Sequence, residues 1–269
     1  MRKIAHIINP VIVNPPSDLF IAQPITFESM RIAQENAMNC VDVELLSAQF
    51  EEDVEFVPSF FNKTPNLNRS VLEFGSFKKK LPLLKDILDR MYQNSDAEYL
   101  IYTNVDIALK PNFYIEVNNL IKKGYDAFVI NRRTISSKFK SVEELPLMHN
   151  ELGKKHPGYD CFVFKRDLYQ NLKLGRVMIG ANWIGWTLLT NLISYSNKIR
   201  IFENLHLTFH IGEERVWRNK IYDDYSQFNY NEYLSIANAI TLETGKFSKF
   251  KKHYKALKIP KFLFILKYL

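Results

Sequence analysis

Residues 98–113 read EYLIYTNVDIALKPNF, a short apolar run that ends in a polar turn. The run Tyr99–Tyr102 consists of strong β formers, as is typical of a strand covered on both faces in an α/β sheet. Asn104 and Asp106 follow it directly. Because ligands of open α/β sheets bind beyond the carboxyl ends of strands, a cation or a sugar nucleotide would be held here. Asn and Asp also cap ordinary turns, so the pattern alone leaves a purely structural interpretation open.

Helical patterns flank this strand on both sides. Residues 78–92 place Leu81, Leu84, Leu88 and Met91 at helical spacing, and residues 113–122 predict a second helix. A helix, a strand, an Asn-x-Asp turn, a proline and another helix together resemble the nucleotide-sugar half of GT-A glycosyltransferases. That family carries an Asp-x-Asp motif at this position. In this chain Asn104 replaces the first carboxylate, which removes one negative charge from any divalent-cation site.

Strand and helix patterns also alternate in the rest of the chain. A strand over 4–8, a helix from Thr26 and Ser29 to Met38 and a strand over 41–46 predict a βαβ start and a parallel sheet. Further strands are expected at 125–130, 161–164 and 199–203. The predicted fold class is α/β, a GT-A-like, mostly parallel sheet sandwiched by helices. A single domain over residues 1–245 and a tail over 246–269 fit the length of 269 residues.

Composition and charge exclude several classes of protein. A hydrophobic content of 46% with 14% aromatics argues against disorder. The net charge of +7 comes from the tail, which holds eight lysines and no acid, so a nucleic-acid-binding face is not expected. Cys40 and Cys161 form no disulfide framework, which suits the cytoplasm. No run of about 18 apolar residues predicts a spanning helix.

The tail combines its lysines with the apolar run Phe262–Leu266. Lysines interleaved with large apolar side chains suit an anionic membrane surface, so the protein is expected to be cytoplasmic and possibly peripheral at the inner face of the membrane. A tail helix packed on the body or on a partner, with its lysines outward, is the alternative interpretation.

The resemblance implies a nucleotide-sugar donor, UDP- or GDP-linked, and a divalent cation, Mn²⁺ or Mg²⁺. His210, followed by Gly212 and Trp217, is similar to the late histidine of several GT-A families, so Asp106 and His210 are the expected metal ligands. The first strand of these enzymes ends beneath the nucleotide base. Position therefore suggests Asn9 and Asp18 as contacts of the base.

Asn104 and Asp106 are also expected to contact the donor. Basic side chains should neutralise its phosphates, because guanidinium matches phosphate geometry. Four arginines are candidates for this role: Arg69, Arg132, Arg133 and Arg215. A solvated helix start and pairing with an acid at the edge of the core are the structural alternatives for these arginines.

Asp160 is the candidate catalytic base. It precedes the apolar strand 161–164, and in GT-A enzymes an acid in the acceptor half can take the proton of the acceptor hydroxyl. An aspartate paired with Arg132 or Arg133 is the competing interpretation. Asn182 and Trp183 are expected to bind the acceptor, a saccharide or a lipid-linked sugar, because indole faces stack on sugar rings. Trp186 is expected to pack in the core. The polar segment 136–155 predicts a mobile loop that closes over the donor.

These features predict a glycosyltransferase of cell-surface polysaccharide or glycan synthesis. A sugar-phosphate nucleotidyltransferase shares the fold, but it would carry a glycine-rich loop after the first strand, and residues 9–18 contain no glycine. A degenerate GT-A module that binds a saccharide or a partner without turnover is the non-enzymatic alternative. Asn104 and the absence of a carboxylate beside Trp183 are compatible with this non-enzymatic alternative.

Overall fold

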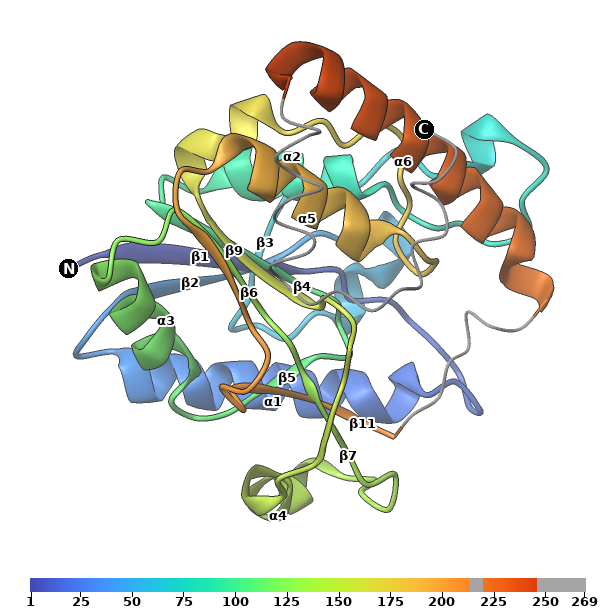
Figure 1. The fold of residues 1–269 in the computed structure, drawn as a ribbon. Coiled ribbons are helices and arrows are strands. Elements are labelled where there is room, and N and C mark those ends of the chain that lie inside the picture. The colour runs from blue at the N-terminus through green and yellow to red at the C-terminus, as the bar shows by residue number, and fades with distance from the viewer. Residues whose placement is uncertain (213–219, 246–269) are drawn as a thin grey trace.

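The protein is described by a computed structural model that covers residues 1–212 and 220–245. A seven-stranded sheet runs through its centre in the order β10-β6-β9-β4-β1-β2-β3 (Figure 1). Neighbouring strands are parallel except at β9, which is antiparallel to both β4 and β6. The strands are β1 (Lys3–Ile8), β2 (Asp42–Ser47), β3 (Asn62–Lys63), β4 (Tyr99–Thr103), β6 (Ala127–Ile130), β9 (Cys161–Lys165) and β10 (Ile199–Phe202). The expected mostly parallel α/β sheet is confirmed.

Helices cover both faces of this sheet (Figure 1). On one face, α1 (Leu19–Ala37) and α3 (Phe113–Lys122) pack on side chains of β1 and β4 that point to that side of the sheet, and together they form a core. On the other face lie α2 (Leu84–Asn94), α5 (Ile184–Tyr195) and α6 (Asp223–Thr244). Two cores on opposite sides explain why the central strands are apolar throughout: every residue of β4 is buried.

A smaller sheet lies beside the first one, in the order β5-β11-β7-β8. Its strands are β5 (Ala108–Leu109), β11 (Thr208–Ile211), β7 (Arg133–Ile135) and β8 (Lys154–Lys155). The short helix α4 (Leu145–Asn150) projects beyond β7 (Figure 1). Short 3-10 helices cover Glu51–Phe56, Val71–Phe74, Val142–Glu144, Arg166–Asn171 and Lys220–Tyr222.

Three local expectations are wrong. Helix α1 begins at Leu19 instead of Thr26, because Asp18 caps it and Pro24 is accommodated inside it. Helix α2 begins only at Leu84, because Pro82 follows Leu81 and disfavours helix in the residue before it. The segment 136–155 is no continuous loop but contains α4 and β8, since Leu145 and Met148 are buried with Phe209.

The fold gathers several strand ends at one edge of the large sheet. Strands β1, β4 and β6 end there, and they are followed by Asn9, Asn104 and Asn131. Because β9 is antiparallel, it begins at the same edge: Cys161 pairs with Thr103 of β4 and with Ile130 of β6. Residues that follow β4 and β6 and residues that precede β9 therefore lie together at this edge.

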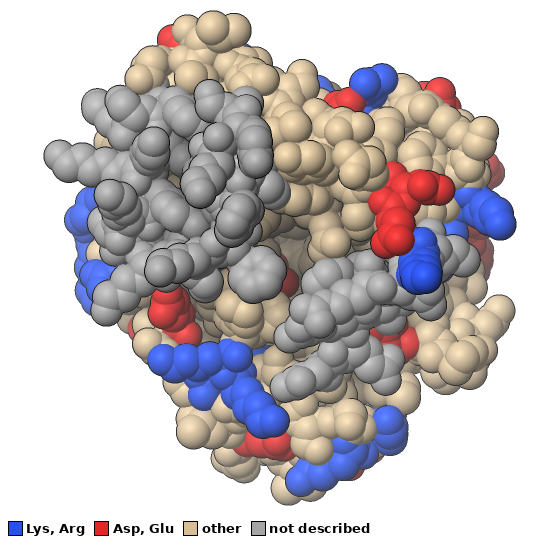
Figure 2. Space-filling view, turned by 45° about the vertical axis from the view of Figure 1, so that its right-hand side comes forward, with Lys and Arg blue, Asp and Glu red and all other residues tan. Residues whose placement is uncertain are grey.

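The described surface carries both signs of charge. In the face of Figure 2, groups of Lys and Arg alternate with Asp and Glu, and basic groups lie at its lower edge. No helix within residues 1–212 and 220–245 is long and apolar enough to cross a membrane.

Candidate active site

Two cavities meet at Asp106, beyond the carboxyl end of β4. The larger one has a volume of about 520 Å³ and the smaller one about 250 Å³. Both are lined by Asn104, Asp106, Ala181 and Ile184. Two ligands bound in these cavities would come into contact at the Asn104–Asp106 turn.

A buried polar triad holds the end of β4 below this turn. The ring of His6 contacts the hydroxyl of Tyr114 through Nδ1 (2.8 Å) and the hydroxyl of Thr103 through Nε2 (2.9 Å). Burial lowers the pKa of His6 to about 3, so the imidazole is neutral and one ring nitrogen accepts a hydrogen bond. Thr103 immediately precedes Asn104, whose Oδ1 accepts a hydrogen bond from the hydroxyl of Tyr102 (3.0 Å).

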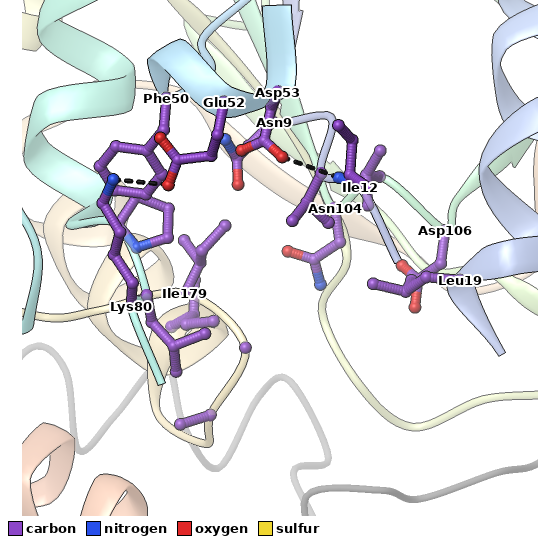
Figure 3. Close-up of a pocket in the computed structure, with 17 residues that line it drawn as sticks. Asn9, Ile12, Leu19, Phe50, Glu52, Asp53, Lys80, Asn104, Asp106 and Ile179 are labelled. Atoms are coloured by element: carbon purple, nitrogen blue, oxygen red, sulfur yellow. Dashed lines mark hydrogen bonds and ion pairs between the residues drawn. The ribbon is translucent and has the colours of Figure 1, made fainter. Parts of the chain in front are cut away.

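Several polar groups of the larger cavity already have partners in the protein (Figure 3). Asn9 Nδ2 donates to the carbonyl of Ala48 (2.5 Å), and the backbone N–H of Ile12 donates to Asp53 Oδ1 (2.8 Å). Burial raises the pKa of the Asp53 carboxyl. Lys80 Nζ pairs with Glu52 Oε1 (2.6 Å) and lies 4.0 Å above the ring of Phe50. Asn104 and Asp106 lie across the cavity from this pair (Figure 3).

Asp106 faces His210 at the junction of the cavities. Asp106 Oδ2 lies 3.2 Å from His210 Nε2, and Oδ1 of Asp106 is buried without a hydrogen-bond partner. Burial would raise the pKa of Asp106, but the hydrogen bond and positive potential of His210 lower it, so the carboxyl is ionised. His210 Nδ1 donates to the carbonyl of Gly212 (2.9 Å), so Nε2 is the nitrogen that donates to Asp106 when it carries a proton and that offers its lone pair to a cation when it does not.

This arrangement fits a divalent cation. One carboxylate and one imidazole nitrogen converge, and the unpartnered Oδ1 of Asp106 can accept a further bond. Among residues 1–212 and 220–245, no group of three or more His, Cys, Asp and Glu side chains is arranged for a metal. The pair therefore supplies two ligands, and a bound substrate would have to supply others.

Asp160 and Arg132 form an ion pair in the smaller cavity. Asp160 Oδ2 lies 3.5 Å from Arg132 Nε, and neither atom has a hydrogen-bond partner. Both side chains are 13% exposed. Burial raises the pKa of Asp160, an effect that Arg132 opposes and Asp106 reinforces. Arg132 Nη2 also lies 3.5 Å from His156 Nε2.

Aromatic rings form much of the remaining wall of the smaller cavity. Tyr159 and Trp186 meet edge to face, with their ring centroids 5.4 Å apart and their planes at 90°. Trp183 packs against Tyr230 and Tyr233 of α6, at centroid distances of 4.9 and 5.2 Å. Its backbone has a φ of 81°, which is rare for a bulky residue. These contacts hold Trp183 in a strained conformation at the start of α5.

The structure brings most of the predicted site residues to these cavities. They are Asn9, Asn104, Asp106, Arg132, Asp160, Asn182, Trp183 and His210. The pairing of Asp160 with Arg132, considered from the sequence as the competing interpretation, is observed together with its place in the cavity.

The other predicted residues lie elsewhere. Asp18 caps α1 and lines a third cavity of about 280 Å³, which His210 also lines. Arg69 pairs with Asp86, and Arg133 donates to the carbonyls of Leu152 (3.1 Å) and Gly153 (2.7 Å), so neither guanidinium lines the two cavities. Arg69 follows the alternative of pairing with an acid, whereas Arg133 is held by backbone carbonyls, an outcome that neither structural alternative described. Arg215 and Trp217 lie outside the described residues.

Sequence reasoning missed several residues that line the cavities. Glu52 and Asp53 lie in a 3-10 helix after β2, and His156 and Tyr159 line the smaller cavity. Trp186 packs against the core, as expected, and also lines this cavity. The run Glu51-Glu52-Asp53 after a strand was a usable signal, because β2 neighbours β1 and its carboxyl end shares the same edge.

No protein-family model matches this chain, and no curated protein matches its sequence. Its structure is similar to S. aureus TarS in complex with UDP-GlcNAc, with a TM-score of 0.53 and 9% identity over 95% of this chain and 74% of that one. M. tuberculosis glucosyl-3-phosphoglycerate synthase gives a TM-score of 0.51 and 14% identity over 88% of this chain and 81% of the other. A structure of the latter with Mg²⁺ and UDP gives 0.50 at 13% identity, over 88% and 80% of the two chains. The chain has the GT-A fold.

Proposed function

We propose that this protein is a glycosyltransferase that moves a sugar from a nucleoside-diphosphate donor to an acceptor hydroxyl. The observation that carries the proposal is the place of Asp106. In a GT-A fold it lies beyond β4, where two cavities of unequal size meet. TarS and glucosyl-3-phosphoglycerate synthase, which share the fold, have been crystallised with UDP-GlcNAc and UDP respectively, which supports a nucleotide-sugar donor here.

The larger cavity is assigned to the nucleoside, and the diphosphate is assigned to its end at Asp106. Three carboxylates line this cavity, Glu52, Asp53 and Asp106, against the single ammonium of Lys80. A diphosphate entering there meets net negative charge among the described side chains, so a cation is needed. Asp106 and His210 would hold Mn²⁺ or Mg²⁺. The metal would neutralise the charge that develops on the leaving diphosphate.

Asp160 is assigned as the general base for the acceptor hydroxyl. A base must be within reach of the proton that it takes, and Asp160 lines the smaller cavity together with Asp106. Its raised pKa makes the carboxylate a better proton acceptor than an exposed aspartate. Arg132 keeps the carboxylate ionised and positions it through their ion pair.

The acceptor is a saccharide or a lipid-linked sugar, and the protein would act in cell-surface polysaccharide or glycan synthesis. The lysines and the apolar run of residues 246–269, which lie outside the described residues, would dock the cytoplasmic protein on the inner face of the membrane. Sedimentation with anionic liposomes tests this part. Full-length protein should bind and a chain truncated after Gly245 should not, whereas equal sedimentation of both would refute membrane docking by the tail.

A panel of nucleotide sugars, tested with and without Mn²⁺ for release of nucleoside diphosphate, examines the central proposal. We expect at least one donor to be turned over by the native chain and not by Asp106→Asn. Asp96→Asn is a matched control, since this exposed carboxylate pairs only with Lys3 on the surface. Tight nucleotide binding without turnover of any donor would instead favour a non-catalytic module.

A further inference from the structure

We propose that the smaller cavity is a subsite for a neutral pyranose ring, which packs against the Tyr159–Trp186 pair and donates a hydroxyl hydrogen bond to Asp160. This inference rests on the proposed function and narrows the acceptor to an uncharged sugar ring. The volume of about 250 Å³ lies below the usual range for pockets of larger ligands and suits one ring.

The stacking surface consists of the Tyr159–Trp186 pair. Both rings line the cavity, both are half-buried, and their edge-to-face contact fixes their relative orientation. Trp183, which the sequence favoured for this role, packs its ring against those of Tyr230 and Tyr233, so part of its stacking surface is used within the protein. Trp186 is therefore the tryptophan of the acceptor platform.

A close approach of two backbones builds this platform. A Cβ atom at Gly185 would lie 2.9 Å from the carbonyl oxygen of Tyr159 and 3.3 Å from its Cβ. The glycine lets the segment that carries Tyr159 pack directly on the first turn of α5. Trp186 follows Gly185, so the same contact places both rings in the wall of the cavity.

The polar groups of the cavity favour a neutral polyhydroxyl ligand. Asp160 Oδ2 is buried without a hydrogen-bond partner, and an ionised carboxylate only accepts hydrogen bonds. Sugar hydroxyls supply the missing donors. The guanidinium of Arg132 is already paired with Asp160, so it is not free to bind a carboxylate or a phosphate on the ring.

A saccharide array tests the proposal with the full-length chain in the presence of UDP and Mn²⁺. The array carries neutral hexose and N-acetylhexosamine pyranosides, uronic acids, sugar phosphates and open-chain polyol phosphates. We expect capture by at least one neutral pyranoside. Trp186→Leu, which retains apolar bulk, should weaken this capture roughly tenfold or more, and Trp186→Phe should weaken it less. Phe20→Leu is the matched control, because Phe20 is 50% exposed and lies outside both cavities.

Three results would overturn the inference: capture only by charged or open-chain members, equal capture by Trp186→Leu, and no capture by any neutral pyranoside. If Trp186→Leu does not fold, as judged by circular dichroism, Tyr159→Leu takes its place with the same expectation. A calorimetric titration with UDP reports on the proposed function separately. UDP binding without capture of a pyranoside refutes the subsite alone, whereas capture without UDP binding refutes the nucleotide site alone.

Discussion

The two cavities that meet at Asp106 differ in how their polar groups are bonded. In the larger cavity, Asn9, Asp53 and Lys80 have partners within the protein. In the smaller one, buried atoms of Asp160 and Arg132 lack hydrogen bonds. An unsatisfied buried polar group carries a free-energy penalty of about 1–3 kcal/mol, so such groups persist mainly where a ligand can use them.

The contrast assigns different tasks to the two sides. Away from Asp106, the polar groups Asn9, Asp53 and Lys80 of the larger cavity are bonded before any ligand arrives, and this part would select a nucleoside by shape and by a few fixed polar groups. The smaller cavity holds charged groups that need a substrate to satisfy them, as expected where bonds are made and broken. Substitutions on the smaller side should therefore reduce turnover, and peripheral ones on the larger side should have little effect on binding.

The largest effect is expected for Asp106→Asn, because this side chain belongs to both cavities. The amide keeps the shape of the carboxylate but removes its charge, so the diphosphate loses the cation that neutralises it. We expect kcat to fall roughly 10³-fold with an unchanged circular dichroism spectrum. Turnover assays beside Asp96→Asn measure the effect. An Asp106→Asn enzyme as active as this control would show that the two cavities do not share a catalytic group.

Asp160→Asn should reduce kcat roughly 10²-fold and leave UDP affinity unchanged, because it acts in the smaller cavity. The native enzyme needs the ionised form of a carboxyl whose pKa burial has raised above 3.8. Its kcat/KM should therefore rise with pH through that raised pKa and reach a plateau above it. The variant lacks the group, so this limb of its pH profile should be flat. An identical acidic limb in both proteins would assign the base elsewhere.

His210→Ala tests the junction between the cavities. If Asp106 and His210 hold a cation, Mn²⁺ should tighten UDP binding by the native chain, and the variant should lose most of this gain, roughly tenfold in Kd. Calorimetric titrations with Mn²⁺ and with EDTA measure the difference. Equal UDP affinity under both conditions in the native chain would indicate that arginine side chains neutralise the phosphates without a metal.

Apolar periodicity predicted the large sheet and the place of Asp106, because both follow from local patterns. The run 99–102 specifies a strand, and strand ends share one edge in a parallel sheet. The position that a long polar side chain takes depends on which hydrogen-bond acceptors the tertiary structure brings near it, and a local pattern does not show this. Nothing in the sequence distinguishes Arg69 and Arg133 from Arg132, yet of these three arginines only Arg132 lines the smaller cavity. Likewise, nothing in the sequence around 180–190 showed which tryptophan α6 would cover.

Gly185→Ala should produce a moderate effect confined to the smaller cavity. The added Cβ would meet the Tyr159 carbonyl at 2.9 Å, so the segment must move away from α5. We expect the acceptor KM to rise about fivefold while UDP affinity is retained. Gly75→Ala is the control, since the atoms nearest to its new Cβ belong to the ring of Phe77 and not to a backbone. A changed UDP affinity in Gly185→Ala with an unchanged acceptor KM would contradict the division of tasks between the cavities.

Lys80→Met should have the smallest effect, although Lys80 is the one cation that lines the larger cavity among the described residues. Its ammonium pairs with Glu52, but the two side chains are 42% and 54% exposed, and exposed ion pairs contribute about 0–1 kcal/mol. Methionine also preserves the apolar stem over Phe50. We therefore expect UDP affinity to change less than about threefold, as for the control Lys85→Met, whose exposed pair with Asp89 lies outside both cavities. A loss of tenfold or more in calorimetric titrations would mean that Lys80 leaves Glu52 to bind phosphate, and the larger cavity would then take part in neutralising the leaving group.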